Sequence, residues 1–82
     1  MLLHIRRLFV TDFERREAMN SFMVAKTYGV LALMYLHAEG KITENVKRCS
    51  SECSRFENAG AQLLGFKHAD EMHRYVARHG HL

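Results

Sequence analysis

Residues 28–38 read Tyr-Gly-Val-Leu-Ala-Leu-Met-Tyr-Leu-His-Ala, and in a helix they would present apolar side chains in almost every direction. A chain of 82 residues buries only about 60 to 65 per cent of the surface that its unfolded form exposes. Such a small domain cannot surround that helix by itself. The stretch therefore predicts a long helix and a partner that covers part of it.

The composition favours a helical, folded chain. Hydrophobic residues make up 48% of the sequence and proline is absent, so long uninterrupted helices are permitted and disorder is not expected. The formal charge is +3, and the basic residues occur as short pairs with acidic residues between them. That pattern is typical of a solvated surface and not of a nucleic-acid-binding stripe. We expect one all-α domain over residues 1–82.

Two residues mark the start of the first long helix. Thr11 and Glu14 have the spacing of a capping box, in which the hydroxyl and the carboxylate bind free amides at a helix start. Gly40 is well placed as the left-handed residue that ends a helix. These signals predict a helix over 12–39. Residues 1–10 before it fit either a short helix or an arm.

Further capping signals follow Gly40. Thr43 is a favourable N-cap for a second helix over about 44–64, which a tight turn would make antiparallel to the first. Gly65 predicts its end, with Phe66 folding back on the preceding turn. A shorter helix over about 68–79 would end at Gly80. The expected fold is a helical hairpin or three-helix domain, assembled into a helical-bundle oligomer.

The two long helices differ in how their apolar residues are distributed. The second has one heptad seam: Ile42, Val46, Cys49, Cys53, Phe56, Gly60 and Leu63. The first has three stripes, of which one partner helix can cover only one or two. One stripe consists of Met19, Met23, Val30 and Leu33, and another of Val24, Leu31, Met34 and Ala38.

The remaining stripe of the first helix is rich in small residues, which let another helix backbone approach closely. We assign this stripe to self-association across a two-fold axis. Its residues are Ala18, Phe22, Ala25, Gly29, Ala32 and Leu36.

Residues 61–66 read Ala-Gln-Leu-Leu-Gly-Phe and precede a short predicted helix. This pattern resembles the centre of helix-turn-helix DNA-binding domains, where a small residue lets two helices cross and a glycine four positions later makes the turn. Glu71 stands where that family has an apolar residue. The resemblance implies a nucleic-acid-binding module over residues 61–74 as the alternative function, with contacts from Lys67, His68, His73 and Arg74.

We expect no enzyme, cofactor or metal site. The sequence has no recognisable combination of nucleophile, base and orienting group. Cys49 and Cys53 could ligate zinc with the C-terminal histidines, but their spacing fits small apolar residues of a helix seam better.

Cellular location is predicted from the cysteines and the apolar residues. Free thiols and the lack of a secretory signal predict a cytoplasmic protein. Residues 22–38 carry Lys26 as their only charge, so a membrane-associated protein is a minor alternative.

The main functional hypothesis is a small regulatory protein that binds another protein and forms a homo-oligomer. Inhibitors, antirepressors and adaptors of phages or other mobile elements are examples of this class. Exposed aromatic residues would form the target surface, because aromatics dominate such interfaces. The candidates are Phe9, Phe13, Tyr28, Tyr35 and Tyr75.

Overall fold

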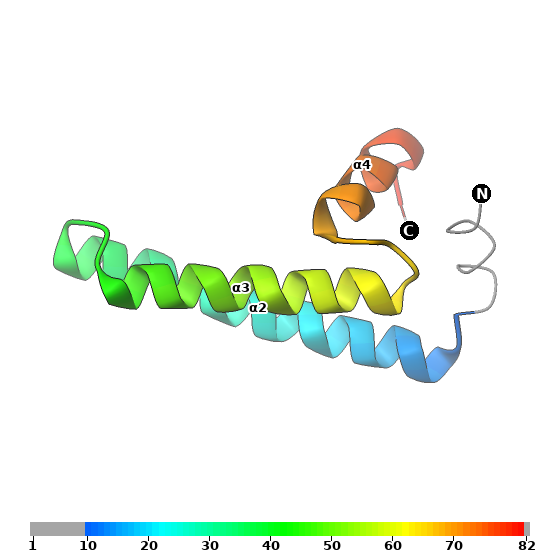
Figure 1. Cartoon of the computed structure of the whole chain (residues 1–82), viewed down its shortest axis with the longest axis horizontal. Coiled ribbons are helices and arrows are strands. Elements are labelled where there is room, and N and C mark those ends of the chain that lie inside the picture. Colours follow the sequence, from blue (N-terminus) through cyan, green and yellow to red (C-terminus); the bar gives the residue numbers. More distant parts are fainter. Residues whose placement is uncertain (1–9, 82) are drawn as a thin grey trace.

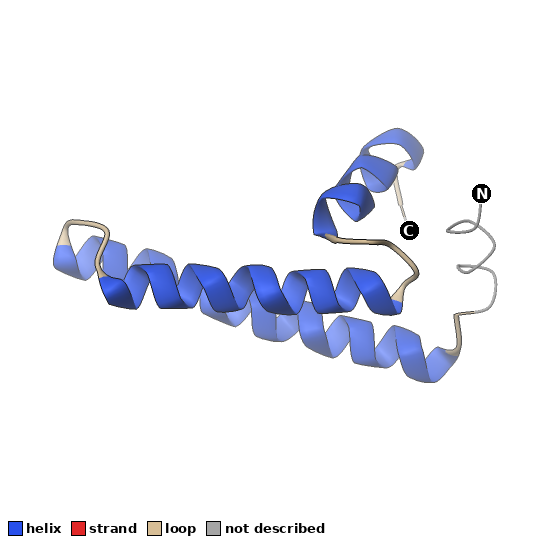
Figure 2. Cartoon of the chain, in the orientation of Figure 1, coloured by secondary structure: helices blue, strands red, loops and turns tan. Residues whose placement is uncertain are grey.

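The computed structural model describes residues 10–81, which form three helices and no strand (Figures 1 and 2). Helix α2 spans Asp12–Glu39, α3 spans Glu44–Leu63 and α4 spans Ala69–His79. α2 and α3 lie side by side as an antiparallel hairpin, and α4 packs against the end of α3 that is distant from the hairpin turn (Figure 1). The all-α prediction is confirmed. The predicted arm or short helix over 1–10 lies, except for Val10, outside the described residues.

The start of α2 has the predicted capping box. The backbone amide of Glu14 donates to Thr11 Oγ1 at 3.1 Å, and the amide of Thr11 donates to Glu14 Oε1 at 3.1 Å. Gly40 ends the helix with a left-handed φ of 70°, and its amide donates to the carbonyl of Leu36 at 2.8 Å. Local sequence chemistry therefore determines both ends of α2.

The hairpin turn is held by Glu39, the last residue of α2. Thr43 occupies the N-cap position of α3, but its hydroxyl donates to Glu39 Oε2 instead of capping an α3 amide. Asn45 Nδ2 donates to Glu39 Oε1 at 3.2 Å. The predicted position of Thr43 is confirmed, while its hydroxyl joins the two helices and does not cap the second one.

α2 and α3 meet along a line of small and medium-sized side chains, which we call the α2–α3 seam. It consists of Ala18, Ala25 and Ala32 on α2, and of Val46, Cys49 and Gly60 on α3. An added Cβ at Gly29 would lie 3.4 Å from Cys53 Sγ, and one at Gly60 would lie 2.6 Å from Phe22 Cε1. The two backbones therefore approach closely where side chains are smallest.

This arrangement places most of the predicted self-association stripe against α3 of the same chain. Ala18, Ala25 and Ala32 are buried, and Phe22 and Gly29 are half-buried and contact α3. Leu36, at the end of the stripe, stays 37% exposed. The physical reason is tethering: a short turn holds α3 at high effective concentration beside α2. The tethered helix occupies the face that allows the closest approach. Ile42 of the predicted α3 seam is 68% exposed.

The junction between α3 and α4 is a Schellman turn. Gly65 is left-handed with φ 94°, Phe66 donates its amide to the carbonyl of Ala61, and Gly65 donates to that of Gln62, both at 3.0 Å. Phe66 is 3% exposed and packs with Ala61, Ala69 and Met72. The predicted stop at Gly65 and the return of Phe66 are confirmed.

The seam yields a paired test of helix packing. Gly60→Ala gains about 1 kcal/mol of helix propensity but pushes a methyl group into the Phe22 ring, and overpacking costs about 1 to 3 kcal/mol. We expect its free energy of unfolding to fall by about 1 kcal/mol. Urea denaturation followed by circular dichroism at fixed protein concentration measures this change.

Gly29→Ala is the matched control, because its new methyl group would meet only ordinary contact distance at Cys53. We expect it to raise the free energy of unfolding by about 0.5 to 1 kcal/mol. Equal effects of the two substitutions would contradict the described approach of Phe22 to Gly60.

Candidate protein-interaction surface

The side of α2 that faces away from α3 carries large exposed apolar side chains. Met23 and Val30 stand two residues before the buried Ala25 and Ala32, and two residues turn a helix by about 200°. We call this set the outer α2 face. It consists of Met19 (57% exposed), Met23 (66%), Val30 (48%), Leu33 (67%) and Met34 (60%).

Few polar groups interrupt the outer α2 face. The hydroxyl of Thr27 donates to the carbonyl of Met23 at 3.0 Å, so its donor is already satisfied. Lys26 is exposed within the face, and a lysine can lay its aliphatic stem on apolar neighbours while its ammonium group stays in water. Several large apolar side chains gathered on one exposed helix face mark an interaction site more often than scattered ones do.

The five aromatic candidates for target binding do not form one surface. Phe13 is 70% exposed near the start of α2, whereas Tyr75 on α4 packs against Phe66 at a ring distance of 5.5 Å. Tyr28 stacks on Phe56 of α3, with ring centroids 5.9 Å apart, and Tyr35 is 38% exposed. Phe9 lies outside the described residues.

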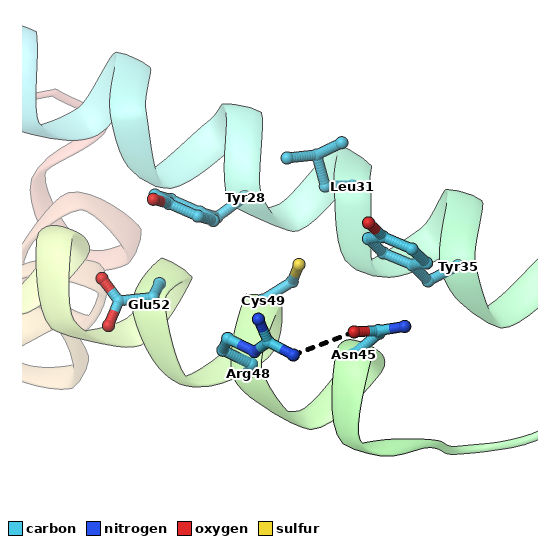
Figure 3. A pocket seen from close by; sticks show the side chains of 7 residues that line it. All are labelled: Tyr28, Leu31, Tyr35, Asn45, Arg48, Cys49 and Glu52. Atoms are coloured by element: carbon cyan, nitrogen blue, oxygen red, sulfur yellow. Dashed lines mark hydrogen bonds between the residues drawn. The ribbon is translucent and has the colours of Figure 1, made fainter.

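Tyr28 and Tyr35 share a pocket of about 360 Å³ on one flank of the α2–α3 seam, shown in Figure 3. We call it the tyrosine pocket. Both helices contribute to its walls, and the buried thiol of Cys49 faces α2 between them (Figure 3). Its lining residues are Tyr28, Leu31, Tyr35, Asn45, Arg48, Cys49 and Glu52.

The charged residues of the tyrosine pocket have different partners. Glu52 Oε2 accepts from Arg55 Nη2 at 2.5 Å and from Arg55 Nε at 3.2 Å. The hydrogen bond to Glu52, followed by the charge of its carboxylate, raises the pKa of Arg55. Arg48 Nη2 instead donates to the neutral Asn45 Oδ1 at 2.9 Å. Arg48 thus has no carboxylate partner within residues 10–81.

The residues predicted to contact nucleic acid lie at or near α4, and the side chains of three of them have partners within the chain; Arg74 Nε donates to the carbonyl of Asp70 at 3.4 Å. His68 Nδ1 accepts from the amide of Glu71 at 3.2 Å and so caps α4, while His73 Nε2 lies 3.2 Å from Glu57 Oε1. The side chains of Lys67 and Arg74 are exposed.

The packing register of α4 and its first turn both differ from the helix-turn-helix pattern. The helix-turn-helix pattern requires an apolar residue at the position of Glu71. In this chain the buried residue is Met72, one position later. Asp70 and Glu71 lie in the first turn of α4, where they disfavour a nearby phosphate.

The described residues contain neither a group of metal ligands nor a helix suited to cross a membrane. Residues 10–81 contain no group of three or more His, Cys, Asp or Glu side chains that could hold a metal ion. No helix among them combines the length and the apolar character that crossing a bilayer requires. Cys49 and Cys53 are free thiols.

Comparison of the chain with protein-family models, with curated proteins and with solved structures found no match.

Sequence reasoning missed the polar wall of the tyrosine pocket. Tyr28, Leu31 and Tyr35 have the i, i+3, i+7 spacing of one helix face, which could have grouped them. Whether Asn45, Arg48 and Glu52 line the pocket depends on how α3 is rotated about its own axis relative to α2. The sequence of α2 does not determine this rotation.

The nucleic-acid alternative has a direct test. We expect the protein not to retard a 20-base-pair DNA duplex at about 50 mM salt, because acidic side chains occupy the first turn of α4. Gel retardation with the natural chain and with a Lys67→Glu, Arg74→Glu double variant measures this. Retardation that the double variant abolishes, and that falls steeply as salt rises, would establish the alternative instead.

A hydrogen bond ties the first residue of α4 to α3. Asn58 Oδ1 accepts from the part-buried amide of Ala69 at 2.7 Å. Asn58→Ala leaves that amide without its partner, at a cost of about 1 kcal/mol. We expect amide hydrogen exchange in α4 to quicken about fivefold, while exchange in α2 stays unchanged.

Asn20→Ala, at an exposed position of α2, is the control for this substitution. Mass spectrometry of proteolytic fragments reports exchange for each helix. Equal acceleration in all the described helices would mean that the hydrogen bond supports the whole fold rather than α4.

Proposed function

We propose that the protein is a small, non-enzymatic regulator that binds other proteins and works as a homo-oligomer built on the outer α2 face. The observation that carries this proposal is the gathering of five large exposed apolar side chains on one side of a single helix. Fully burying a side chain of this kind contributes about 1.5 to 3 kcal/mol. Covering the face would therefore add stability comparable with that of a small domain.

A second copy is a suitable cover because the face is nearly symmetric about its own middle. An antiparallel copy crossing near residues 26–27 places Met19 opposite Met34 and Met23 opposite Val30. Methionine side chains are flexible and polarizable, which suits them to fill such an interface. Each copy then covers the apolar side chains of the other.

The target would bind surfaces that self-association leaves exposed. Phe13, Tyr35 and the tyrosine pocket lie outside the outer α2 face, so they remain accessible in the proposed assembly. The class we favour is an inhibitor, antirepressor or adaptor, such as phages and other mobile elements encode. This assignment is by analogy of class. We place the protein in the cytoplasm, where the thiols of Cys49 and Cys53 stay reduced.

Met23→Glu tests the proposed assembly. A carboxylate buried without a partner costs about 3 to 5 kcal/mol, which weakens self-association at least about a hundredfold. We expect analytical ultracentrifugation to give the monomer mass for this variant and an oligomer mass for the natural chain.

Ile42→Glu is the matched control, since Ile42 is 68% exposed and Met23 is 66% exposed. Ile42 lies in the hairpin turn, outside the outer α2 face, so its substitution should leave the oligomer mass unchanged. The proposal fails if the natural chain is a monomer at micromolar concentration, or if the two variants have the same mass.

A further inference from the structure

We infer that the tyrosine pocket binds a small apolar carboxylic acid, with the carboxylate on Arg48 and the apolar body between Tyr28 and Tyr35. A ligand at this place would act as an effector of the regulatory protein, which goes beyond the self-association and target binding proposed above. The inference rests on the pocket's size, its lining and the partners of its charged groups.

The size and lining suit a small ligand with an apolar body. Ligand pockets have volumes of about 300 to 1,000 Å³ and combine apolar walls with a few polar groups. The tyrosine pocket has about 360 Å³. Tyr28, Leu31 and Tyr35 supply its α2 wall, and Cys49 reaches toward them from α3 (Figure 3).

Contacts within the chain hold the walls in position before any ligand arrives. Tyr28 stacks on Phe56 with an interplanar angle of 9°, and the guanidinium of Arg55 lies 4.5 Å from the centroid of the Phe56 ring. On the other side, Asn45 bridges Glu39 and Arg48. A preorganised pocket loses little conformational entropy on binding, and this favours affinity.

Charge determines the class of ligand. Glu52 is paired with Arg55, so its negative charge is balanced from outside the pocket. Arg48 has only the neutral amide of Asn45 as a partner among the described residues. The pocket therefore presents one guanidinium without a balancing acid, and a guanidinium is suited to forked hydrogen bonding with a carboxylate.

The pocket stays open in the proposed assembly. Val30 of the outer α2 face follows Tyr28 by two residues, a turn of about 200° around the helix. A second copy on the outer α2 face would thus lie on the opposite side of α2 from the pocket. Ligand binding and self-association can be measured separately on the same sample.

The probe for this inference is 4-phenylbutyrate, with its uncharged amide, 4-phenylbutyramide, as the matched ligand. Titration of isotope-labelled full-length protein should give saturable shifts of the backbone NMR signals of Tyr28, Tyr35 and Cys49. We expect the acid to bind about threefold to tenfold more tightly than the amide, because an exposed Arg–carboxylate pair is partly screened by water.

The variants that test this inference replace exposed residues, so their substitution should not change the fold. Arg48→Gln should lower the affinity for the acid to that for the amide, and Arg48→Lys should restore part of the difference. Lys47→Gln is the control, since Lys47 neighbours Arg48 in sequence but pairs with Glu44 and does not line the pocket. It should leave the affinity unchanged.

Three results would each overturn the inference. These are equal binding of acid and amide, shifts confined to the outer α2 face, and an unchanged affinity in Arg48→Gln. If N-acetyl-Leu-Phe binds more than tenfold more tightly than 4-phenylbutyrate, the ligand is a peptide C-terminus and not a small acid. Ultracentrifugation of the same samples reports self-association, so failure here is distinguishable from failure of the proposed assembly.

Discussion

The close approach of α2 and α3 along the α2–α3 seam is the constraint on which the rest of the structure depends. Alanine at positions 18, 25 and 32 and glycine at positions 29 and 60 remove the bulk that would hold the two helices apart. The hairpin is therefore held by many short contacts between backbones and small side chains. Since α4 packs on the end of α3, its position depends on the same seam.

This packing explains why large apolar side chains are exposed. The contact inside the chain uses the smallest residues of α2, so the methionines and Leu33 point elsewhere. A surface helix of a monomeric protein usually has its bulky apolar residues on the buried face and polar residues on the exposed face. In α2 the bulky apolar residues are on the exposed face. The exposure of the outer α2 face therefore follows from the choice of small residues for the contact with α3.

Helix ends were predictable from sequence, whereas the faces of α2 were not. Thr11, Glu14, Gly40 and Gly65 act through local backbone chemistry, which sequence spacing reports directly. The three stripes of α2 are all apolar, so the choice among them depends on energies of packing against a helix elsewhere in the chain. For the same reason Arg48 could not be assigned to the tyrosine pocket, because its place depends on how α3 is rotated.

The position of Phe22 links two parts of the molecule that share few other contacts. Its ring touches the backbone of α3 at Gly60 and packs against the cluster that holds α4. Phe22 lies about one helical turn after Met19 and directly before Met23. Because the same ring contacts Gly60 and the cluster under α4, a shift of α2 at Phe22 would also change the packing under α4.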